Sequence, residues 1–163
     1  LMAVDAQSGK RFALGRDDAP KVSLEDAVCA SYAVPGCCPP VEIGNHTFVD
    51  GGVASPTSAD FAQDADIEEA IVLAPFASSH PDKPRSPLTR LERHVRKTMT
   101  RIVDSECAKL RTAGIRVIRL EPGREDLQAI GYNMLDPGRR KQVFETSLRT
   151  SPNAVRAAIG FAN

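Results

Sequence analysis

Short stretches in which hydrophobic and polar residues alternate occupy the first third of the chain. The turn-forming residues 7–10 separate two of these stretches, so residues 2–6 and 11–15 are predicted to form a β-hairpin. Ser23 is typical of a helix N-cap, and we expect a helix over residues 24–32.

The segment that follows is expected to be mostly irregular. Residues 37–44 are predicted to form a loop, because two consecutive prolines favour an extended path. A short strand is predicted over residues 46–50, and it leads into Asp50-Gly51-Gly52. Residues 59–70 contain five acidic residues and no basic residue, which is typical of a solvated surface.

A different pattern begins near residue 69. Residues 69–75 form a short continuous apolar run, as in a buried parallel strand. After a loop rich in proline and serine over residues 78–87, apolar residues recur at every third or fourth position over 88–110 and predict a long amphipathic helix. A second strand is predicted over 115–120. Strand, helix and strand together predict a βαβ unit, and hence an α/β class with a largely parallel sheet.

Two helices are predicted near the C-terminus. The first begins at Asp136-Pro137 and places Val143, Phe144 and Leu148 on one face. The second covers residues 155–159. A chain of 163 residues has the size of one domain, so a single domain is expected.

Composition removes several classes of function. Basic and acidic residues balance at 21 each, so net charge favours neither a nucleic-acid partner nor an anionic membrane. No apolar run approaches the roughly 20 residues of a membrane-spanning helix, and no secretory signal is visible. The four cysteines, two of them adjacent, do not have the spacing of a disulfide framework, so we expect reduced thiols and a cytoplasmic location. The histidines His46, His80 and His94 lack metal-ligand spacing, so no metal and no cofactor are expected.

Asp50-Gly51-Gly52 taken alone is a common turn sequence, and its flanks change the interpretation. Residues 30–35 read Ala-Ser-x-Ala-x-Pro, a Pro39-Pro40 loop follows, and the short strand then leads into the Asp-Gly-Gly triplet. In order and spacing, residues 27–56 resemble the second conserved block of patatin-like phospholipases. The pair Cys37-Cys38 departs from that block, where the family usually has a bulky apolar residue and a neighbour.

The resemblance implies a three-layer α/β/α sandwich, of which residues 1–163 would be the C-terminal portion of a single domain. It implies a serine acyl hydrolase with a Ser–Asp dyad, acting on a phospholipid, a lysophospholipid or a simpler carboxylic ester. Asp50 would be the general base, and Gly51 and Gly52 would complete its motif. A carboxylate with a solution pKa of ~3.9 is a weak base, and burial beside apolar groups would raise that pKa.

The nucleophile of such an enzyme is not on this chain. A Gly-x-Ser-x-Gly motif needs two glycines four positions apart, and none of the 11 glycines satisfy that spacing. Ser31, Ser55 and Ser58 are therefore expected to have capping or loop roles. The resemblance implies that the nucleophile lies on the N-terminal half of the same domain, either upstream or on a separate chain.

Two alternatives stay open. The chain could be a non-catalytic module that binds a lipid or a partner, or a small-molecule-binding domain in which Asp-Gly-Gly is only a turn. Between residues 80 and 101, basic residues exceed acidic ones by five. This excess is typical of a solvated helix face, and it could also bring a transient contact with a membrane surface or an acidic partner.

Overall fold

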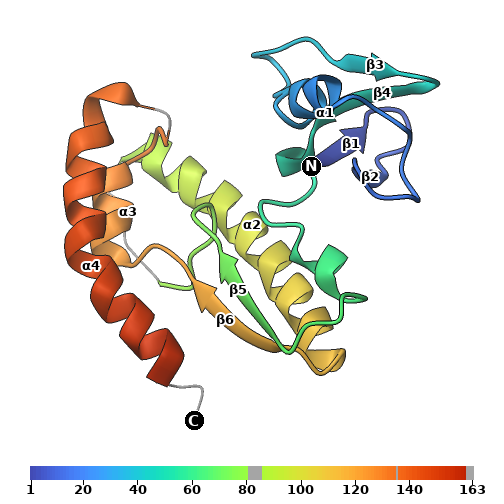
Figure 1. Ribbon diagram of the computed structural model, residues 1–163. Coiled ribbons are helices and arrows are strands. Elements are labelled where there is room, and N and C mark those ends of the chain that lie inside the picture. The colour runs from blue at the N-terminus through green and yellow to red at the C-terminus, as the bar shows by residue number, and fades with distance from the viewer. Residues whose placement is uncertain (81–85, 135, 161–163) are drawn as a thin grey trace. The chain divides into compact units, whose positions relative to one another are not determined.

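A computed structural model describes residues 1–80, 86–134 and 136–160 (Figure 1). The chain divides into two compact units, Leu1–Phe61 and Ala62–Asn163, where its length alone suggested one domain. Strands and helices are mixed in both units, which confirms the α/β class. Of the predicted loop over residues 78–87, residues 81–85 lie outside the described part of the chain.

The first unit is built on a four-stranded sheet in the order β2-β1-β4-β3, with every neighbouring pair antiparallel. Strands β1 (Met2–Asp5) and β2 (Arg11–Ala13) confirm the predicted hairpin, and Gly9 in their connection has a φ of +69°. Strand β4 (His46–Asp50) has the predicted bounds. The expectation of a largely parallel sheet is wrong for this unit, because each of its strands pairs with a neighbour that runs the opposite way.

Strand β3 (Val41–Ile43) corrects the prediction of a loop over residues 37–44. Its three residues pair with β4, with Val41 opposite Phe48. Gly44, at a φ of +60°, lies in the tight connection between the two strands. A segment this short gains its strand conformation from that partner rather than from its own pattern.

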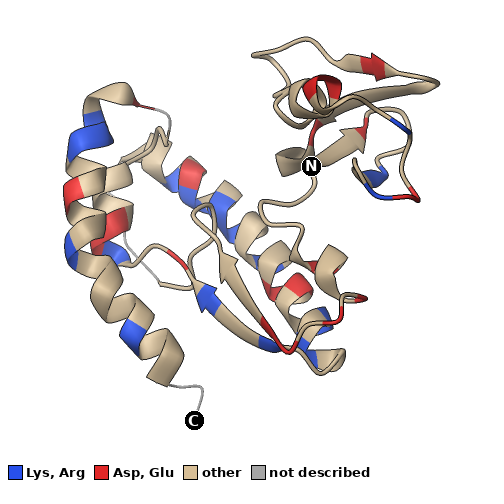
Figure 2. Ribbon diagram, viewed as in Figure 1, with Lys and Arg blue, Asp and Glu red and all other residues tan. Residues whose placement is uncertain are grey.

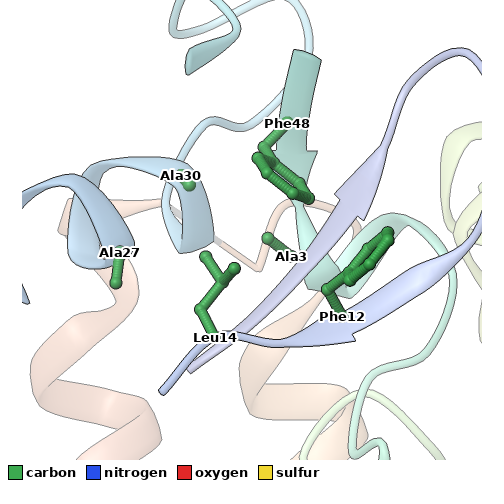
Figure 3. Close-up of a cluster of buried hydrophobic side chains, with 6 residues drawn as sticks. All are labelled: Ala3, Phe12, Leu14, Ala27, Ala30 and Phe48. Atoms are coloured by element: carbon green, nitrogen blue, oxygen red, sulfur yellow. The ribbon is translucent and has the colours of Figure 1, made fainter. Parts of the chain in front are cut away.

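Helix α1 (Leu24–Ser31) confirms the predicted helix and its cap, since the Ser23 hydroxyl accepts a hydrogen bond of 3.0 Å from the Asp26 backbone N–H. Its apolar face covers the sheet (Figure 3). The rings of Phe12 and Phe48 meet edge to face at 5.5 Å between centroids. The buried cluster consists of Ala3, Phe12, Leu14, Ala27, Ala30 and Phe48.

The second unit contains the predicted βαβ arrangement. Strands β5 (Glu69–Leu73) and β6 (Arg116–Leu120) pair in parallel, and α2 (Pro87–Thr112) connects them (Figure 1). Burial alternates along β5: Val72 is buried, whereas Ile71 is 62% and Leu73 is 65% exposed. The expectation of a strand buried on both faces is therefore wrong for the described residues.

The C-terminal region differs from its prediction. Helix α3 (Arg124–Ile130) is new, because its seven residues are too few to give a clear periodic pattern. Helix α4 (Arg140–Gly160) is continuous through Pro152, where two separate helices were expected. Of the predicted apolar face, Phe144 and Leu148 are exposed. Contacts of α4 with α3 and β6 hold it as one helix despite the internal proline.

The acidic segment over residues 59–70 is only partly the solvated surface that was expected. Asp60, in the 3-10 turn η2 (Ala59–Ala62), forms an ion pair of 2.7 Å with Arg11 from β2, and its side chain is largely buried. The ion pair with Arg11 therefore buries one of the five acidic residues of this segment.

Within the described residues, none of the helices combines the length and the apolar character that crossing a bilayer requires. The thiols of all four cysteines are free. Three of them are exposed, and Cys107 on α2 is buried.

Candidate functional site

Asp50 is the last residue of β4 and lies opposite Ala3 of the central strand β1. Its backbone N–H donates a hydrogen bond of 3.0 Å to the carbonyl oxygen of Ala33, just after α1. Three separate parts of the first unit therefore meet at Asp50: two neighbouring strands and the segment after the helix. The position of this residue is set by the fold of the whole unit.

The Asp50 carboxylate faces the short 3-10 turn η1 (Gly51–Val53), which begins directly after it. Its Oδ1 accepts a hydrogen bond of 2.8 Å from the Gly52 backbone N–H, so the side chain caps the turn. Gly52 donates the one hydrogen bond to this carboxylate among the described residues, and it goes to Oδ1 rather than to Oδ2. The side chain is partly buried, less than the apolar enclosure expected from sequence.

The two glycines of the motif have different structural roles. Gly51 is buried against β1, and a Cβ at this position would lie 2.7 Å from the Met2 carbonyl oxygen and 2.8 Å from the Met2 Cβ. A residue without a side chain at position 51 thus allows β1 to approach closely. Gly52 is exposed, and a Cβ on it would lie 3.2 Å from Asp50 Oδ1. A side chain there would crowd the carboxylate rather than a strand.

The serines considered as nucleophiles have local partners. Ser55 is buried, and its hydroxyl oxygen accepts hydrogen bonds from the backbone N–H groups of Thr57 at 3.2 Å and Ser58 at 2.8 Å. Ser58 is also buried, has a φ of 46°, and accepts a hydrogen bond of 3.4 Å from Arg11. These contacts organise the loop after η1, in agreement with the loop roles expected for both residues.

Sequence reasoning missed Asp5, which is buried at the end of β1. Its carboxylate accepts hydrogen bonds from the Ser8 hydroxyl at 2.5 Å and from the Ser8 and Thr47 backbone N–H groups at 3.3 and 3.4 Å. The hydrogen bond from the Ser8 hydroxyl is the main reason that the pKa of Asp5 lies below its ordinary value. The signal in the sequence is the Asp5-x-x-Ser8 spacing of a side-chain-stabilised turn.

His46, the first residue of β4, has a side chain that is 35% exposed. Its ring packs against Phe12 and Phe48, with centroid distances of 5.0 and 5.5 Å. Its Nδ1 lies 3.6 Å from Asp5 Oδ2, so its close carboxylate neighbour is Asp5. Asp5 and His46 thus hold the two hairpins of the sheet together.

Within the described ranges, His, Cys, Asp and Glu residues do not gather in groups of three or more that could hold a metal ion. The second unit has an apolar cavity of about 410 Å³ at the carboxyl ends of β5 and β6, lined also by α4. Asp50, Gly51 and Gly52 are not among its lining residues.

Comparison with known proteins supports the resemblance drawn from the motif. The model of the family described as patatin-like phospholipase matches residues 4–62, the N-terminal part of this chain. The matched segment includes Asp50, Gly51 and Gly52 and ends one residue past the end of the first compact unit. The match does not extend over the second unit, so it does not support assigning all of residues 1–163 to the C-terminal half of one patatin-like domain. No curated protein matches the chain.

Proposed function

We propose that this chain contributes the general base of a lipid acyl hydrolase, and that Asp50 is that base. The observation that carries the proposal is the placement of Asp50 at the end of β4, with its carboxylate oriented by the Gly52 N–H. The match to patatin-like phospholipases over residues 4–62 supplies the class of chemistry, which is the hydrolysis of lipid esters.

In the proposed mechanism, Oδ2 of Asp50, the oxygen that does not accept the Gly52 hydrogen bond, acts as a base in two successive steps. In the first step, Oδ2 takes the proton of a serine hydroxyl as the serine oxygen attacks the ester carbonyl, and it then gives that proton to the alcohol portion of the substrate, which leaves. In the second step, the same carboxylate takes a proton from a water molecule as that water attacks the acyl-serine, and it returns the proton to the serine oxygen as the acid leaves. The bond from Gly52 and the contact of Gly51 with β1 hold the carboxylate in one orientation through both steps.

The serine is proposed to lie on another segment, because no nucleophile motif occurs in the 163 residues. We propose that the serine lies on the N-terminal half of the domain, as an upstream segment or a separate chain. A phospholipid or simpler carboxylic ester would be the substrate, with transient contact to a membrane surface.

The test is Asp50→Asn in the complete polypeptide that includes the serine. The substitution keeps the size of the side chain and its hydrogen bond to Gly52 but removes the base, so hydrolysis of a short-chain nitrophenyl ester should fall about 10²–10⁴-fold. Asp64→Asn, at an exposed carboxylate of the same chain, is the matched control and should leave the rate unchanged. An Asp50→Asn variant that folds normally and keeps more than about half of the activity contradicts the proposal.

A second measurement separates this proposal from a non-catalytic binding module. The 163-residue chain alone should resist labelling by a fluorophosphonate probe, whereas the complete polypeptide should be labelled at one serine outside it. Labelling of the short chain at Ser31, Ser55 or Ser58 overturns the assignment of the nucleophile to another segment. A complete polypeptide that is neither labelled nor hydrolytic supports the binding module.

A further inference from the structure

A hollow of about 580 Å³ in the second unit lies between helix α2 and residues 78–80, which follow the carboxyl end of β5. This segment is held in place on two sides. The Ser78 backbone N–H donates to Thr100 Oγ1 on α2 at 3.0 Å, and the Ser78 hydroxyl donates to the Pro122 carbonyl oxygen after β6 at 2.8 Å. The hollow is therefore bounded by a preformed wall at the edge of the sheet where ligands of open α/β folds commonly bind.

Basic residues recur along α2 (Figure 2), and four of them line the hollow. Two of these four contact an acidic residue and have a structural role. Arg96 is 3% exposed, forms an ion pair of 2.8 Å with Glu92, and donates a hydrogen bond of 2.8 Å to the Pro75 carbonyl oxygen. Arg93 also contacts Glu92 and donates to the Leu127 carbonyl oxygen at 2.9 Å. These two arginines connect α2 to the segment after β5 and to helix α3.

One acidic residue, Asp104, itself lines the hollow, and it is paired in the same way. Arg119 on β6 forms ion pairs with Asp104 on α2 and with Glu121, the latter at 2.6 Å. Burial lowers the pKa of Arg119, but the hydrogen bond to Asp104 and the charge of Glu121 outweigh burial and raise the pKa above its ordinary value. Arg119 with Asp104 and Glu121 has a net charge of one negative unit, and Arg93 and Arg96 with Glu92 have a net charge of one positive unit. The net charges of the two groups therefore cancel.

Lys97 and Arg101 supply the charge that remains. Both are exposed, both line the hollow, and neither has an ion-pair partner among residues 1–80, 86–134 and 136–160. They are four residues apart on one helix, where two like charges repel each other. Folding alone gains nothing from this arrangement, whereas an anion in the hollow would relieve the repulsion.

We propose that this hollow binds a phosphate group. An ammonium and a guanidinium one helical turn apart provide charge and a planar pair of donors, the combination that phosphate oxygens accept. Ser79 and His80 line the same hollow, and their backbone N–H groups already donate to Glu121 and to Ser78, so the Ser79 hydroxyl and the His80 ring are the donors that the opposite wall can add. The volume exceeds what a bare phosphate needs, so the phosphate can carry an organic group such as glycerol. This inference goes beyond the proposed hydrolase and does not depend on Asp50.

The experiment measures binding without turnover, on the 163-residue chain and on the complete polypeptide, in a buffer free of phosphate and sulfate. Calorimetric titration with inorganic phosphate and with glycerol 3-phosphate tests the free anion. Co-sedimentation with phosphatidylcholine vesicles that contain phosphatidic acid tests a lipid headgroup. The variant Lys97→Gln/Arg101→Gln should weaken binding at least about tenfold, since two charge-assisted contacts are lost. The matched control Arg111→Gln/Arg156→Gln changes the net charge equally at exposed positions outside the hollow and should bind as the parent does.

Each outcome has a defined meaning. Saturable binding of the soluble phosphates that the Lys97/Arg101 variant loses supports a free phosphate compound as ligand. Binding confined to the vesicles and lost in that variant supports a lipid headgroup. Absence of binding to all three probes, or an equal loss in the control variant, overturns the proposal. Circular dichroism melting of both variants ensures that lost binding is not lost folding. Loss of ester hydrolysis in Asp50→Asn with intact phosphate binding would separate the two proposals.

Discussion

The substitution Gly51→Ala tests how the Asp50 motif is joined to the sheet. The added Cβ would lie 2.7 Å from the Met2 carbonyl oxygen, 2.8 Å from the Met2 Cβ and 2.9 Å from the Met2 carbonyl carbon. Ordinary contacts begin at 3.4 Å, so β1 or η1 must move by roughly 0.7 Å. Backbone atoms make up part of this contact, and β1 pairs with both β2 and β4, so the strand cannot move without straining the sheet.

The magnitude follows from two opposing effects. Overpacking of this kind typically costs about 1–3 kcal/mol of stability. Replacing glycine by alanine also lowers the conformational entropy of the unfolded chain, which stabilises the folded state by about 0.4–1 kcal/mol and offsets part of that cost. We expect a net loss of about 1–2 kcal/mol, which corresponds to about 5–30-fold more frequent opening of the first unit.

Hydrogen exchange followed by mass spectrometry measures this effect separately in each unit. Peptides that contain β1 and β4 should exchange faster in Gly51→Ala, whereas peptides from α2 should be unchanged. Gly52→Ala is the control, because its nearest neighbour at 3.2 Å is a carboxylate oxygen that can rotate away, and exchange in β1 should change little. Parent-like exchange of β1 and β4 in Gly51→Ala would refute the reasoning, as would equal acceleration by Gly52→Ala.

Two further predictions concern titratable groups. The Ser8 hydroxyl helps to lower the pKa of Asp5 in the folded protein below the ordinary value of 3.8. The ionised carboxylate therefore stabilises the first unit at any pH above 3.8, and this stabilisation is lost as the pH falls through the pKa of Asp5 in the folded protein. Ser8→Ala should therefore raise the Asp5 pKa, measured by carboxyl NMR titration, and an unchanged titration would contradict this assignment. Burial is the main cause that raises the pKa of the Cys107 thiol, so iodoacetamide should modify exposed cysteines such as Cys29 in the native protein and Cys107 only after unfolding. Peptide mass spectrometry checks this order, and rapid native modification of Cys107 would contradict it.

Local signals in the sequence were sufficient to predict the elements that depend on residues close together in the chain. The Ser23 cap, the turn at Gly9 and the bounds of β4 follow from short-range hydrogen bonding and backbone preference. The βαβ unit follows from the long apolar periodicity of α2 between two apolar runs. The Asp50-Gly51-Gly52 motif is a linear pattern, so it too is visible without a structure.

Only the tertiary structure decided which segments meet. The antiparallel order of the first sheet places Met2 against Gly51, and the burial of Asp5 and the pairing of Asp60 with Arg11 depend on the same sheet. Strand β3 exists because β4 offers it a partner, and α4 continues past its proline because α3 and β6 support it. These features depend on residues far apart in the chain, and the periodicity of one segment contains no information about the partner against which that segment will pack.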